Sequence, residues 1–258
     1  MSSALHVVKI GGKLINNEDQ LSSFLQMFTQ IESPKVLIHG GGQKATELSA
    51  LLGIETRMVD GRRITNKDTL DVAVMVYAGL INKRIVARLQ ASGINALGLA
   101  GCDANIIQAV KRPVGEIDFG WVGDIVGVDQ HALKSLISSD FIPVFSAISH
   151  NGKGQLLNTN ADTIAAQIAI ALSSEFNVHL HYCFEYDGVL YDMDTPDLTM
   201  EQITRAEFEE LKSSKGINKG MIPKLSNGFD ALAGGVHQVA VCGISNLISQ
   251  KRATMLTL

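Results

Sequence analysis

The sequence has no surplus of basic residues and no long apolar run, and these two absences exclude whole classes of function. Its 258 residues carry 22 Lys and Arg against 26 Asp and Glu, a formal net charge of -4. Nucleic-acid-binding domains concentrate basic charge on one face, which this mixed distribution does not do. No apolar stretch approaches the roughly 20 residues that a membrane span needs, and we find no apolar signal-peptide segment near the N-terminus. We therefore expect a cytoplasmic protein that binds neither nucleic acid nor membrane.

Cysteine is also scarce, and its spacing excludes the common structural metal sites. Cys102, Cys183 and Cys242 form no C-x-x-C pair and have no histidine cluster nearby, so we expect reduced thiols. His179 and His181 alternate on a predicted strand and would share one face of a sheet, as a metal pair would. Because no third ligand accompanies them, we expect partly buried strand histidines and no resident metal.

Apolar residues and glycine are abundant, and near the N-terminus they form a strand, glycine turn and helix twice. Residues 5–10 are a β-rich run that ends at a glycine pair, and residues 17–31 follow with helical spacing. Residues 35–39 form a second predicted strand, which enters three glycines before a helical pattern at 43–52. This order is typical of parallel βαβ units.

The same alternation continues to the C-terminus, with one interruption. Residues 106–128 are β-rich pieces broken by glycine and proline, which predicts hairpins instead of crossover helices. The pattern therefore predicts an α/β protein with a mainly parallel sheet. Helices are expected at 66–92, 129–138, 160–173, 200–213 and 219–233, and strands at 95–99, 141–148, 178–183 and 237–242.

Glycine and lysine occur together where predicted strands end. Lys9 precedes a glycine pair at the end of the first strand, where open α/β sheets bind their ligands. The run Gly40 to Gly42 follows the second strand, and each of its glycines costs roughly 0.5 to 1 kcal/mol in chain entropy relative to alanine. Close approach of a ligand to the backbone explains such a run better than turn geometry. Neither run matches the P-loop or the dinucleotide fingerprint, so we expect another kind of phosphate-binding site.

Two further segments contain side chains suited to bind an anion. Arg62 and Arg63 follow a predicted turn, and a guanidinium grips a carboxylate with two parallel hydrogen bonds. One of the two is expected to lie in a solvated turn, and the sequence alone does not separate them. Asn158 offers an amide that could bind another amide or a carboxylate.

Asp162 lies where a helix is predicted to begin, and two roles are open to it. Asn160 or Asp162 could simply cap the helix. Alternatively, a carboxylate between two lysines would hold them charged and oriented around a transferring phosphoryl group. Lys224, near Gly220, is then the natural partner of Lys9. Such a set, with magnesium supplied alongside the nucleotide, predicts a kinase for a small acidic substrate.

Together these residues resemble the amino-acid kinase family, and within it the branch of N-acetylglutamate kinases. The resemblance runs essentially end to end and rests on a combination of three motifs: His39-Gly-Gly-Gly42, Gly61-Arg-Arg-Ile-Thr65 and Asn158-Thr-Asn-Ala-Asp162. Aspartokinases differ at the first motif, and glutamate 5-kinases, carbamate kinases and UMP kinases lack the combination. The resemblance implies a single domain with an open three-layer α/β/α fold. Residues 1–172 would form an acyl-amino-acid-binding and dimerisation lobe, and residues 173–258 a nucleotide-binding lobe.

The resemblance also implies a reaction and a role for each site residue. ATP with Mg²⁺ would phosphorylate the γ-carboxylate of N-acetyl-L-glutamate, giving the acyl phosphate and ADP in arginine biosynthesis. Lys9 and Lys224 would stabilise the transition state, and Asp162 would organise both. Gly12 and Gly41 would offer backbone donors to the phosphoryl group. The acylated glutamate would be held by Gly41, Gly42, Arg63 and Asn158, with Arg63 instead of Arg62 gripping its α-carboxylate.

The nucleotide site implied by the resemblance contains a departure from the family pattern. The family typically has an aspartate within Leu-(Thr/Ser)-Asp-Val-x-Gly, whereas this chain has Glu185 at that position, with Asp187 as an alternative for the same role. Lys219 also stands where many relatives carry an acidic residue. The expected nucleotide-binding residues are Glu185, Gly188, Val189, Leu190, Asn218 and Met221.

Several alternatives stay open at this point. The acyl group is acetyl or succinyl, whose extra carboxylate would replace a methyl group. Arginine-inhibited members carry an extra N-terminal helix, whereas here the first strand begins within about five residues of Met1, so we expect an arginine-insensitive homodimer with its long helix near the interface. Another acid kinase of the same fold is a second functional reading. A catalytically silent nucleotide-sensing subunit is a third, and only the departure at Glu185 supports it.

Overall fold

The computed structural model describes residues 3–59, 61–191, 198–214, 216–217 and 220–258. Contacts divide the chain into two compact units, the first comprising Met1–Lys35 with Ala165–Leu258 and the second Val36–Ile164. The expected lobes at 1–172 and 173–258 are contiguous in sequence, whereas the first unit joins both ends of the chain. The reason is that β1 (Ala4–Ile10) pairs in parallel with β11 (Asn177–Cys183).

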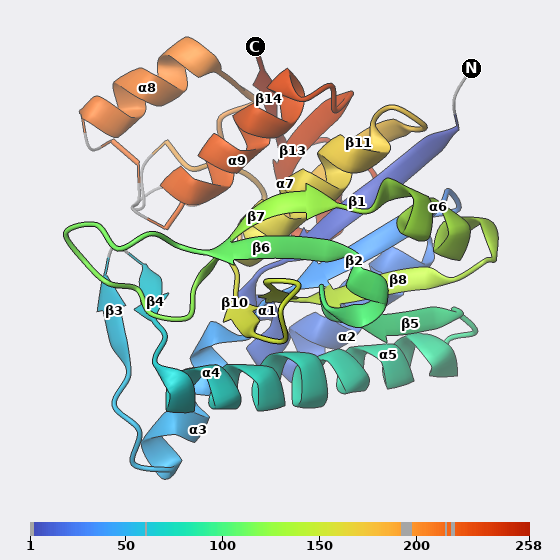
Figure 1. Cartoon of the computed structure of the whole chain (residues 1–258). Coiled ribbons are helices and arrows are strands. Elements are labelled where there is room, and N and C mark those ends of the chain that lie inside the picture. Colours follow the sequence, from blue (N-terminus) through green and yellow to red (C-terminus); the bar gives the residue numbers. More distant parts are fainter. Residues whose placement is uncertain (1–2, 60, 192–197, 215, 218–219) are drawn as a thin grey trace. The chain divides into compact units, whose positions relative to one another are not determined.

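The first unit is an α/β arrangement with parallel strands at its centre (Figure 1). β11 runs parallel to both β1 and β13, whereas β14 runs antiparallel to β13. The strand order is β12 (Gln202–Thr204), β14 (Thr254–Thr257), β13 (Gln238–Cys242), β11 and β1. The helices are α1 (Gly12–Asn16), α2 (Glu18–Thr29), α8 (Arg205–Ser213) and α9 (Ile222–Ala233).

The second unit is also α/β and contains the predicted hairpin. Its parallel strands follow the order β2 (Lys35–His39), β8 (Ile142–Ser146) and β5 (Ala96–Leu99). Residues 106–128 form the antiparallel pair β6 (Ile107–Lys111) and β7 (Gly123–Val128), which confirms the hairpin. The remaining elements are α3 (Gly42–Leu51), β3 (Arg57–Val59), β4 (Arg62–Ile64), α6 (Gln130–Ser138), β9 (Ile148–His150) and β10 (Leu156–Asn158). α7 (Ala161–Leu172) begins in this unit.

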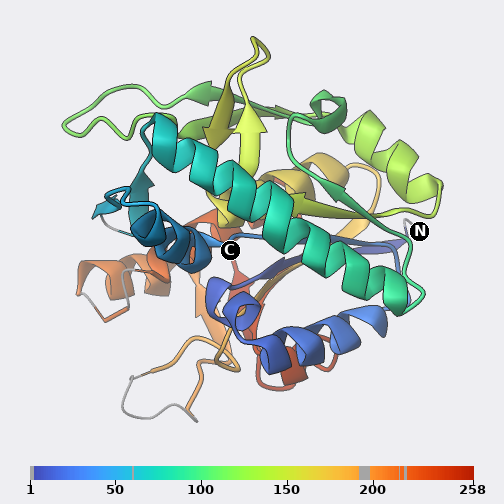
Figure 2. The same cartoon turned by 90° about the horizontal axis from the view of Figure 1, so that it is seen from below.

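One long helical rod crosses the second unit, drawn in teal in Figure 2. It consists of α4 (Lys67–Val74), the π-helical segment η1 (Met75–Ile81) and α5 (Asn82–Ala91). The predicted helix therefore exists, and the Asn66 side chain caps it by accepting a hydrogen bond from the Thr69 N–H at 2.9 Å. Gly93, at φ +76°, follows its end. Helical periodicity gave no sign of the π-helical turn in its middle.

Two expectations near the C-terminus were wrong in detail. The helix predicted over 200–213 begins only at Arg205, because Thr204 and Glu207 form a capping box there and residues 202–204 are strand β12. The helix predicted over 219–233 begins at Ile222. β14 was not predicted, because a four-residue strand carries too little periodicity.

Across the described ranges, no helix is both long and apolar enough to cross a membrane.

Histidines on β1 and β11 pack together on one face of the first unit. The ring of His6 lies 5.1 Å from that of His179 and 5.2 Å from that of His181. His6 Nδ1 and His181 Nε2 are 3.0 Å apart, and His181 is buried. Burial, reinforced by the neighbouring histidines, lowers the pKa of His6 to about 4 and that of His181 to about 3. Both rings are therefore neutral at physiological pH.

This histidine pair makes the stability of the protein depend on pH. Because the folded-state pKa values lie below the ordinary 6.5, the unfolded chain binds more protons, and stability is lost as pH falls from that value toward 4. Each histidine that stays neutral in the folded protein lowers the free energy of unfolding by up to about 1.4 kcal/mol for each pH unit below 6.5. Urea unfolding at about pH 7 and about pH 5 measures it. Compared with the wild type, we expect a smaller pH effect in His181→Phe and an unchanged one in His131→Gln. Equal pH effects in the wild type and both variants would contradict this account.

Candidate active site

Lys9 and Lys224, predicted from different ends of the sequence, meet the same buried tyrosine. Lys9 lies directly opposite Tyr182 in the parallel pairing of β1 and β11, so their side chains share a face. The Lys224 ammonium lies 5.2 Å from the centre of the Tyr182 ring. The charges of both lysines also act on Cys183, whose pKa is raised by a hydrogen bond with Cys242 and by burial. The first unit therefore assembles two buried lysines at one place.

The two glycines after β1 have different reasons to be glycine. A Cβ on Gly11 would lie 3.3 Å from the Cys183 carbonyl oxygen and from Phe184 Cβ, and the Gly11 N–H donates to that oxygen at 2.8 Å. Gly11 thus allows close packing on β11. A Cβ on Gly12 would meet no atom within 4 Å. Gly12 therefore leaves open space over its backbone, as an approaching phosphoryl group requires.

Glu185 forms an ion pair with Lys13, a contact that the sequence did not predict. Lys13 Nζ lies 2.8 Å from the Glu185 carboxylate. This hydrogen bond and the carboxylate charge raise the pKa of Lys13. Lys13 follows Gly12 directly, so a third lysine lies beside the open glycine and is held there by the residue that departs from the family pattern.

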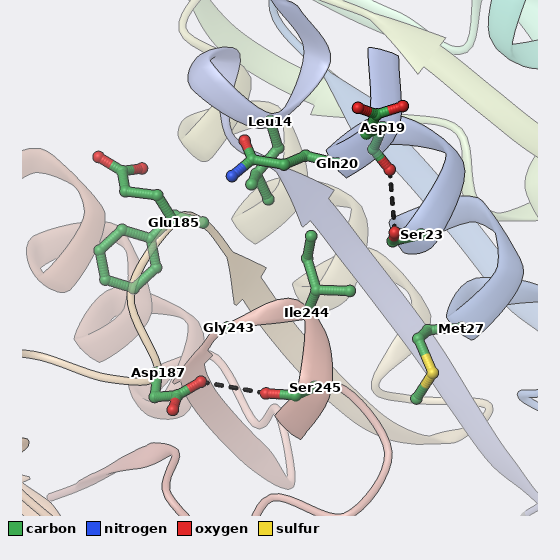
Figure 3. A pocket seen from close by; sticks show the side chains of 11 residues that line it. Leu14, Asp19, Gln20, Ser23, Met27, Glu185, Asp187, Gly243, Ile244 and Ser245 are labelled. Atoms are coloured by element: carbon green, nitrogen blue, oxygen red, sulfur yellow. Dashed lines mark hydrogen bonds between the residues drawn. The ribbon is translucent and has the colours of Figure 1, made fainter. Parts of the chain in front are cut away.

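Glu185 and Asp187 also line a pocket of about 490 Å³ in the first unit. Figure 3 shows the loop residues after β11 and β13 on one side of it and the polar side chains of α2 on the other. Asp187 accepts hydrogen bonds from Ser245 Oγ at 3.2 Å and from Asn246 Nδ2 at 2.8 Å. These bonds hold Asp187 against the loop after β13. Of the two carboxylates, Glu185 is therefore the one that contacts the glycine turn, through its ion pair with Lys13.

The remaining nucleotide residues of the prediction are partly explained by packing. A Cβ on Gly188 would lie 2.7 Å from Thr254 Oγ1, and the Val189 N–H donates to the same hydroxyl at 2.8 Å. Leu190 forms a β-bridge with Thr199. Met221 precedes α9 and is half-buried. Asn218 and Lys219 lie outside the described residues.

The second unit brings together Arg63, Gly41 and Gly42. Arg63 is 8% exposed, and its Nη2 donates at 2.7 Å both to the Gly42 carbonyl oxygen and to Thr46 Oγ1. Arg62, by contrast, is exposed to solvent. The structure thus separates the two arginines that the sequence left equivalent: Arg63 is built into the glycine turn.

Asn158 is tied to the same region through a threonine. Its Nδ2 donates to Thr65 Oγ1 at 3.0 Å, and the Thr65 hydroxyl donates to the Arg63 carbonyl oxygen at 3.2 Å. Thr65 is fully buried. This chain of hydrogen bonds links β10 to the strand that carries Arg63, so the four predicted substrate residues belong to one part of the second unit.

Asp162 and Asn160 divide the two roles that the sequence left open. The Asn160 side chain accepts hydrogen bonds from the backbone N–H groups of Asp162 at 2.8 Å and Thr163 at 3.1 Å. Asn160 is therefore the capping residue. Asp162 itself is 8% exposed, and its carboxylate is not required as the cap. Its role beside the lysines stays a prediction, because it belongs to the second unit.

His39 holds the start of the glycine run in place. Its Nδ1 lies 2.8 Å from the Gly40 carbonyl oxygen, and its Nε2 lies 3.1 Å from Asn82 Nδ2. Burial lowers the pKa of His39 to about 4, so the ring is neutral. A neutral ring that donates from Nδ1 and accepts at Nε2 satisfies both contacts. The histidine is therefore structural.

Comparison with known proteins agrees with this arrangement. The family model described as "Amino acid kinase family" matches residues 4–243. This chain belongs to the amino acid kinase family. It is 52% identical over 241 residues to acetylglutamate kinase of Bacteroides thetaiotaomicron, covering 93% of this chain and 94% of that protein. It is 48% identical over 256 residues to acetylglutamate kinase of Phocaeicola vulgatus, covering 99% of each chain.

A solved structure is similar in fold. The N-acetylglutamate synthase of Neisseria gonorrhoeae superposes with a TM-score of 0.80 at 24% sequence identity, over 99% of this chain and 59% of that one. Such an identity supports the fold alone. The expected α/β/α fold with its mainly parallel sheet is thereby confirmed.

Several contacts of the predicted site residues could not be read from the sequence. Tyr182 lies opposite Lys9 and below the Lys224 ammonium, and Thr65, although part of a quoted motif, links Asn158 to Arg63; only strand register and hydrogen bonding reveal these contacts. Lys13 was visible as a lysine after the glycine pair, and its distance from Glu185 was not. Tyr77, on η1, lies within the helix predicted over 66–92, and helical periodicity gives no indication of a role for its hydroxyl.

The two arginines allow a matched test of the substrate site. We expect Arg63→Ala to raise the KM for the acidic substrate by a factor that corresponds to about 1.5 to 3 kcal/mol, because a charged hydrogen-bond partner is lost, with a smaller effect on kcat. Steady-state kinetics measure both. Arg62→Ala, which removes an exposed guanidinium one residue away, should leave KM unchanged, and equal effects from the two variants would show that Arg63 is not the gripping residue.

Proposed function

We propose that this protein is an ATP-dependent kinase that phosphorylates the γ-carboxylate of N-acetyl-L-glutamate in arginine biosynthesis. The observation that carries the proposal is the pair of buried lysines, Lys9 and Lys224, at Tyr182 in a chain about half identical to acetylglutamate kinases over nearly its whole length. Two buried lysines, one of them on the strand that leads into an open glycine backbone, suit a transferring phosphoryl group. Arg63 beside Gly42 suits an acidic substrate.

In the proposed reaction, a γ-carboxylate oxygen of the substrate attacks the γ-phosphorus of ATP in line. The new bond joins carboxylate oxygen to phosphorus, the bond from phosphorus to the β,γ-bridging oxygen breaks, and ADP leaves with that electron pair. ATP is bound as its Mg²⁺ complex. Lys9 and Lys224 balance the charge of the phosphoryl group, and the Gly12 and Gly41 backbones donate to it. Asp162 keeps the lysines charged and oriented.

The acylated glutamate binds in the second unit in this proposal. Arg63 grips the α-carboxylate, and Gly42 and Asn158 contribute polar groups close to it. The hydrogen bond from Asn158 to Thr65 keeps the amide near this region. An N-succinyl group is an alternative to the acetyl group, and the assay below separates the two.

The nucleotide is proposed to bind the first unit at Glu185, Gly188, Val189, Leu190, Asn218 and Met221. Glu185 supports this through Lys13, a cation that lies next to Gly12. The silent nucleotide-sensing subunit rests only on the substitution at Glu185. An ion pair at this position is compatible with phosphate binding, which favours the active enzyme.

We further propose a cytoplasmic homodimer with the long rod near its interface. Met75 and Leu80 on η1 are 51% and 38% exposed, which leaves apolar surface on this rod. A dimer would cover such surface.

The proposed reaction predicts turnover with one class of substrate. A coupled ADP-release assay with ATP and Mg²⁺, run on N-acetyl-L-glutamate, N-succinyl-L-glutamate, glutamate and aspartate, should show activity with an acylated glutamate. Hydroxylamine trapping should capture the acyl phosphate. Turnover with N-succinyl-L-glutamate alone would show that the acyl group of the substrate is succinyl and not acetyl. Turnover with a free amino acid alone would indicate another acid kinase. Silence with all four in a preparation that binds ATP would favour the sensing subunit.

The charged groups should act mainly on the chemical step. We expect Lys9→Ala and Lys224→Ala to lower kcat far more than substrate affinity, because their charges are needed where phosphoryl charge develops. Asp162→Asn should also lower kcat. Steady-state kinetics with both substrates varied give the comparison, and Lys153→Ala, in an exposed turn, is the control. Normal turnover by Asp162→Asn would refute the organising role.

A further inference from the structure

Tyr77 is a buried phenol on the π-helical segment η1 that no role above requires. It is 5% exposed, and it lies in the middle of the rod formed by α4, η1 and α5. π-helical turns are rare and occur frequently at functional sites, because the extra residue moves a side chain to a position that an α-helix would not give it. The irregular turn at Tyr77 therefore directs attention to where its ring and hydroxyl lie.

The ring of Tyr77 occupies the space in front of Gly41. A Cβ on Gly41 would lie 2.7 Å from Tyr77 Cδ1 and 2.5 Å from Ile81 Cδ1. No side chain fits there, so the glycine is required for the rod to approach the turn after β2. The predicted substrate turn and the π-helical segment are consequently in direct contact within the second unit.

The hydroxyl of Tyr77 faces the space over the next glycine. A Cβ on Gly42 would lie 3.9 Å from Tyr77 Oη and 3.9 Å from Arg63 Nη2. Both distances are ordinary van der Waals contacts, so the point is not filled by protein. A phenol hydroxyl and a guanidinium thus face the same open position over the Gly42 backbone.

The charges at this position suit an anion. The Arg63 guanidinium donates hydrogen bonds to oxygens of Gly42, Thr46 and Thr56, all of which are neutral. Burial raises the pKa of Tyr77, whereas the Arg63 charge and a side-chain hydrogen bond with Arg63 act in the opposite direction. The phenol is therefore protonated at neutral pH and can donate a hydrogen bond. A carboxylate at this point would accept from both groups.

We propose that Tyr77 is a substrate-binding residue whose hydroxyl donates to the same carboxylate that Arg63 grips, the α-carboxylate of the acylated glutamate. This inference rests on the proposed function for the identity of the ligand. The phenol and the guanidinium then form a two-point clamp over Gly42, and the hydroxyl adds selectivity for a carboxylate over an uncharged group.

Tyr77→Phe tests this clamp because it removes the hydroxyl and keeps the ring that packs on Gly41. We expect the KM for the acylated glutamate to rise about tenfold or more, the loss of one hydrogen bond to a charged group. The KM for ATP should not change, and kcat should change by less than about threefold. Tyr191→Phe, which removes a hydroxyl from a tyrosine that is 64% exposed, is the matched control and should behave as the wild type.

A substrate analogue and an Arg63→Ala background together separate contact with the carboxylate from packing and from an indirect effect on Arg63. With the α-carboxamide of N-acetyl-L-glutamate, the wild type should bind weakly, and Tyr77→Phe should weaken binding much less than it does for the acid. If Tyr77 packed without touching the substrate, the penalty would be equal for acid and amide, and if it only positioned Arg63, Tyr77→Phe would add no further penalty in an Arg63→Ala background. An unchanged KM for the acid in folded Tyr77→Phe would also overturn the inference.

Binding experiments keep this test distinct from that of the reaction. Calorimetric titration of N-acetyl-L-glutamate into the wild type and Tyr77→Phe reports the clamp even where turnover is absent, whereas absent turnover counts against the proposed function alone. Should Tyr77→Phe not fold, Gly42→Ala replaces it, since its methyl group would occupy the point that both groups face without a clash. Loss of acylated-glutamate binding with ATP binding retained supports the clamp, and unchanged binding of both refutes it.

Discussion

The parallel register between β1 and β11 is the constraint on which the first unit depends. It sets Lys9 opposite Tyr182 and Ile10 opposite Cys183, although these residues are separated by most of the chain. Gly11 extends the pairing by donating to the Cys183 carbonyl oxygen. A shift of one residue would turn Lys9 to the other face of the sheet and separate it from Lys224. The register therefore determines whether Lys9 lies on the same face of the sheet as Lys224.

Each glycine of the two turns serves a different need. Gly11 and Gly41 are closely packed. A Cβ on Gly11 would crowd Phe184, and a Cβ on Gly41 would clash with Tyr77 and Ile81. Gly12 and Gly42 have free space around the Cβ position. Each turn thus pairs a glycine whose Cβ position is occupied by neighbouring atoms with a glycine whose Cβ position is open. The first brings elements close together and the second leaves room for a ligand, so neither turn is explained by chain flexibility.

Buried charge is the energetic cost of this arrangement. Lys9, Lys224, Arg63 and Asp162 are each less than 9% exposed, and removing such groups from water costs several kcal/mol unless other groups compensate. Arg63 is compensated by oxygens of Gly42, Thr46 and Thr56. Lys224 lies over the Tyr182 ring, a cation-π contact worth up to about 2 kcal/mol when desolvated. The fold retains these charges at a cost in stability, which is consistent with the use of the three cations in binding anions.

The sequence by itself determined the class of fold and most of the elements. Alternation of strand and helix patterns predicted the α/β class, and the Asn66 and Asp129 caps lie where the helices begin. Local interactions decide such features, since a cap or a periodic face needs only neighbouring residues. The motifs also pointed to Lys9, Arg63, Asn158, Asp162 and Lys224 as one set.

Only the tertiary structure decided how those residues are used. It separated Arg63 from Arg62 by burial, assigned the helix cap to Asn160 instead of Asp162, and tied Asp187 to the loop after β13. It also brought Lys13 to Glu185 and Tyr77 to Gly42. These outcomes depend on strand register and on side-chain contacts between residues far apart in the chain. Periodicity and local propensity carry no information about such contacts, so the sequence predicted the members of the site and the fold decided their partners.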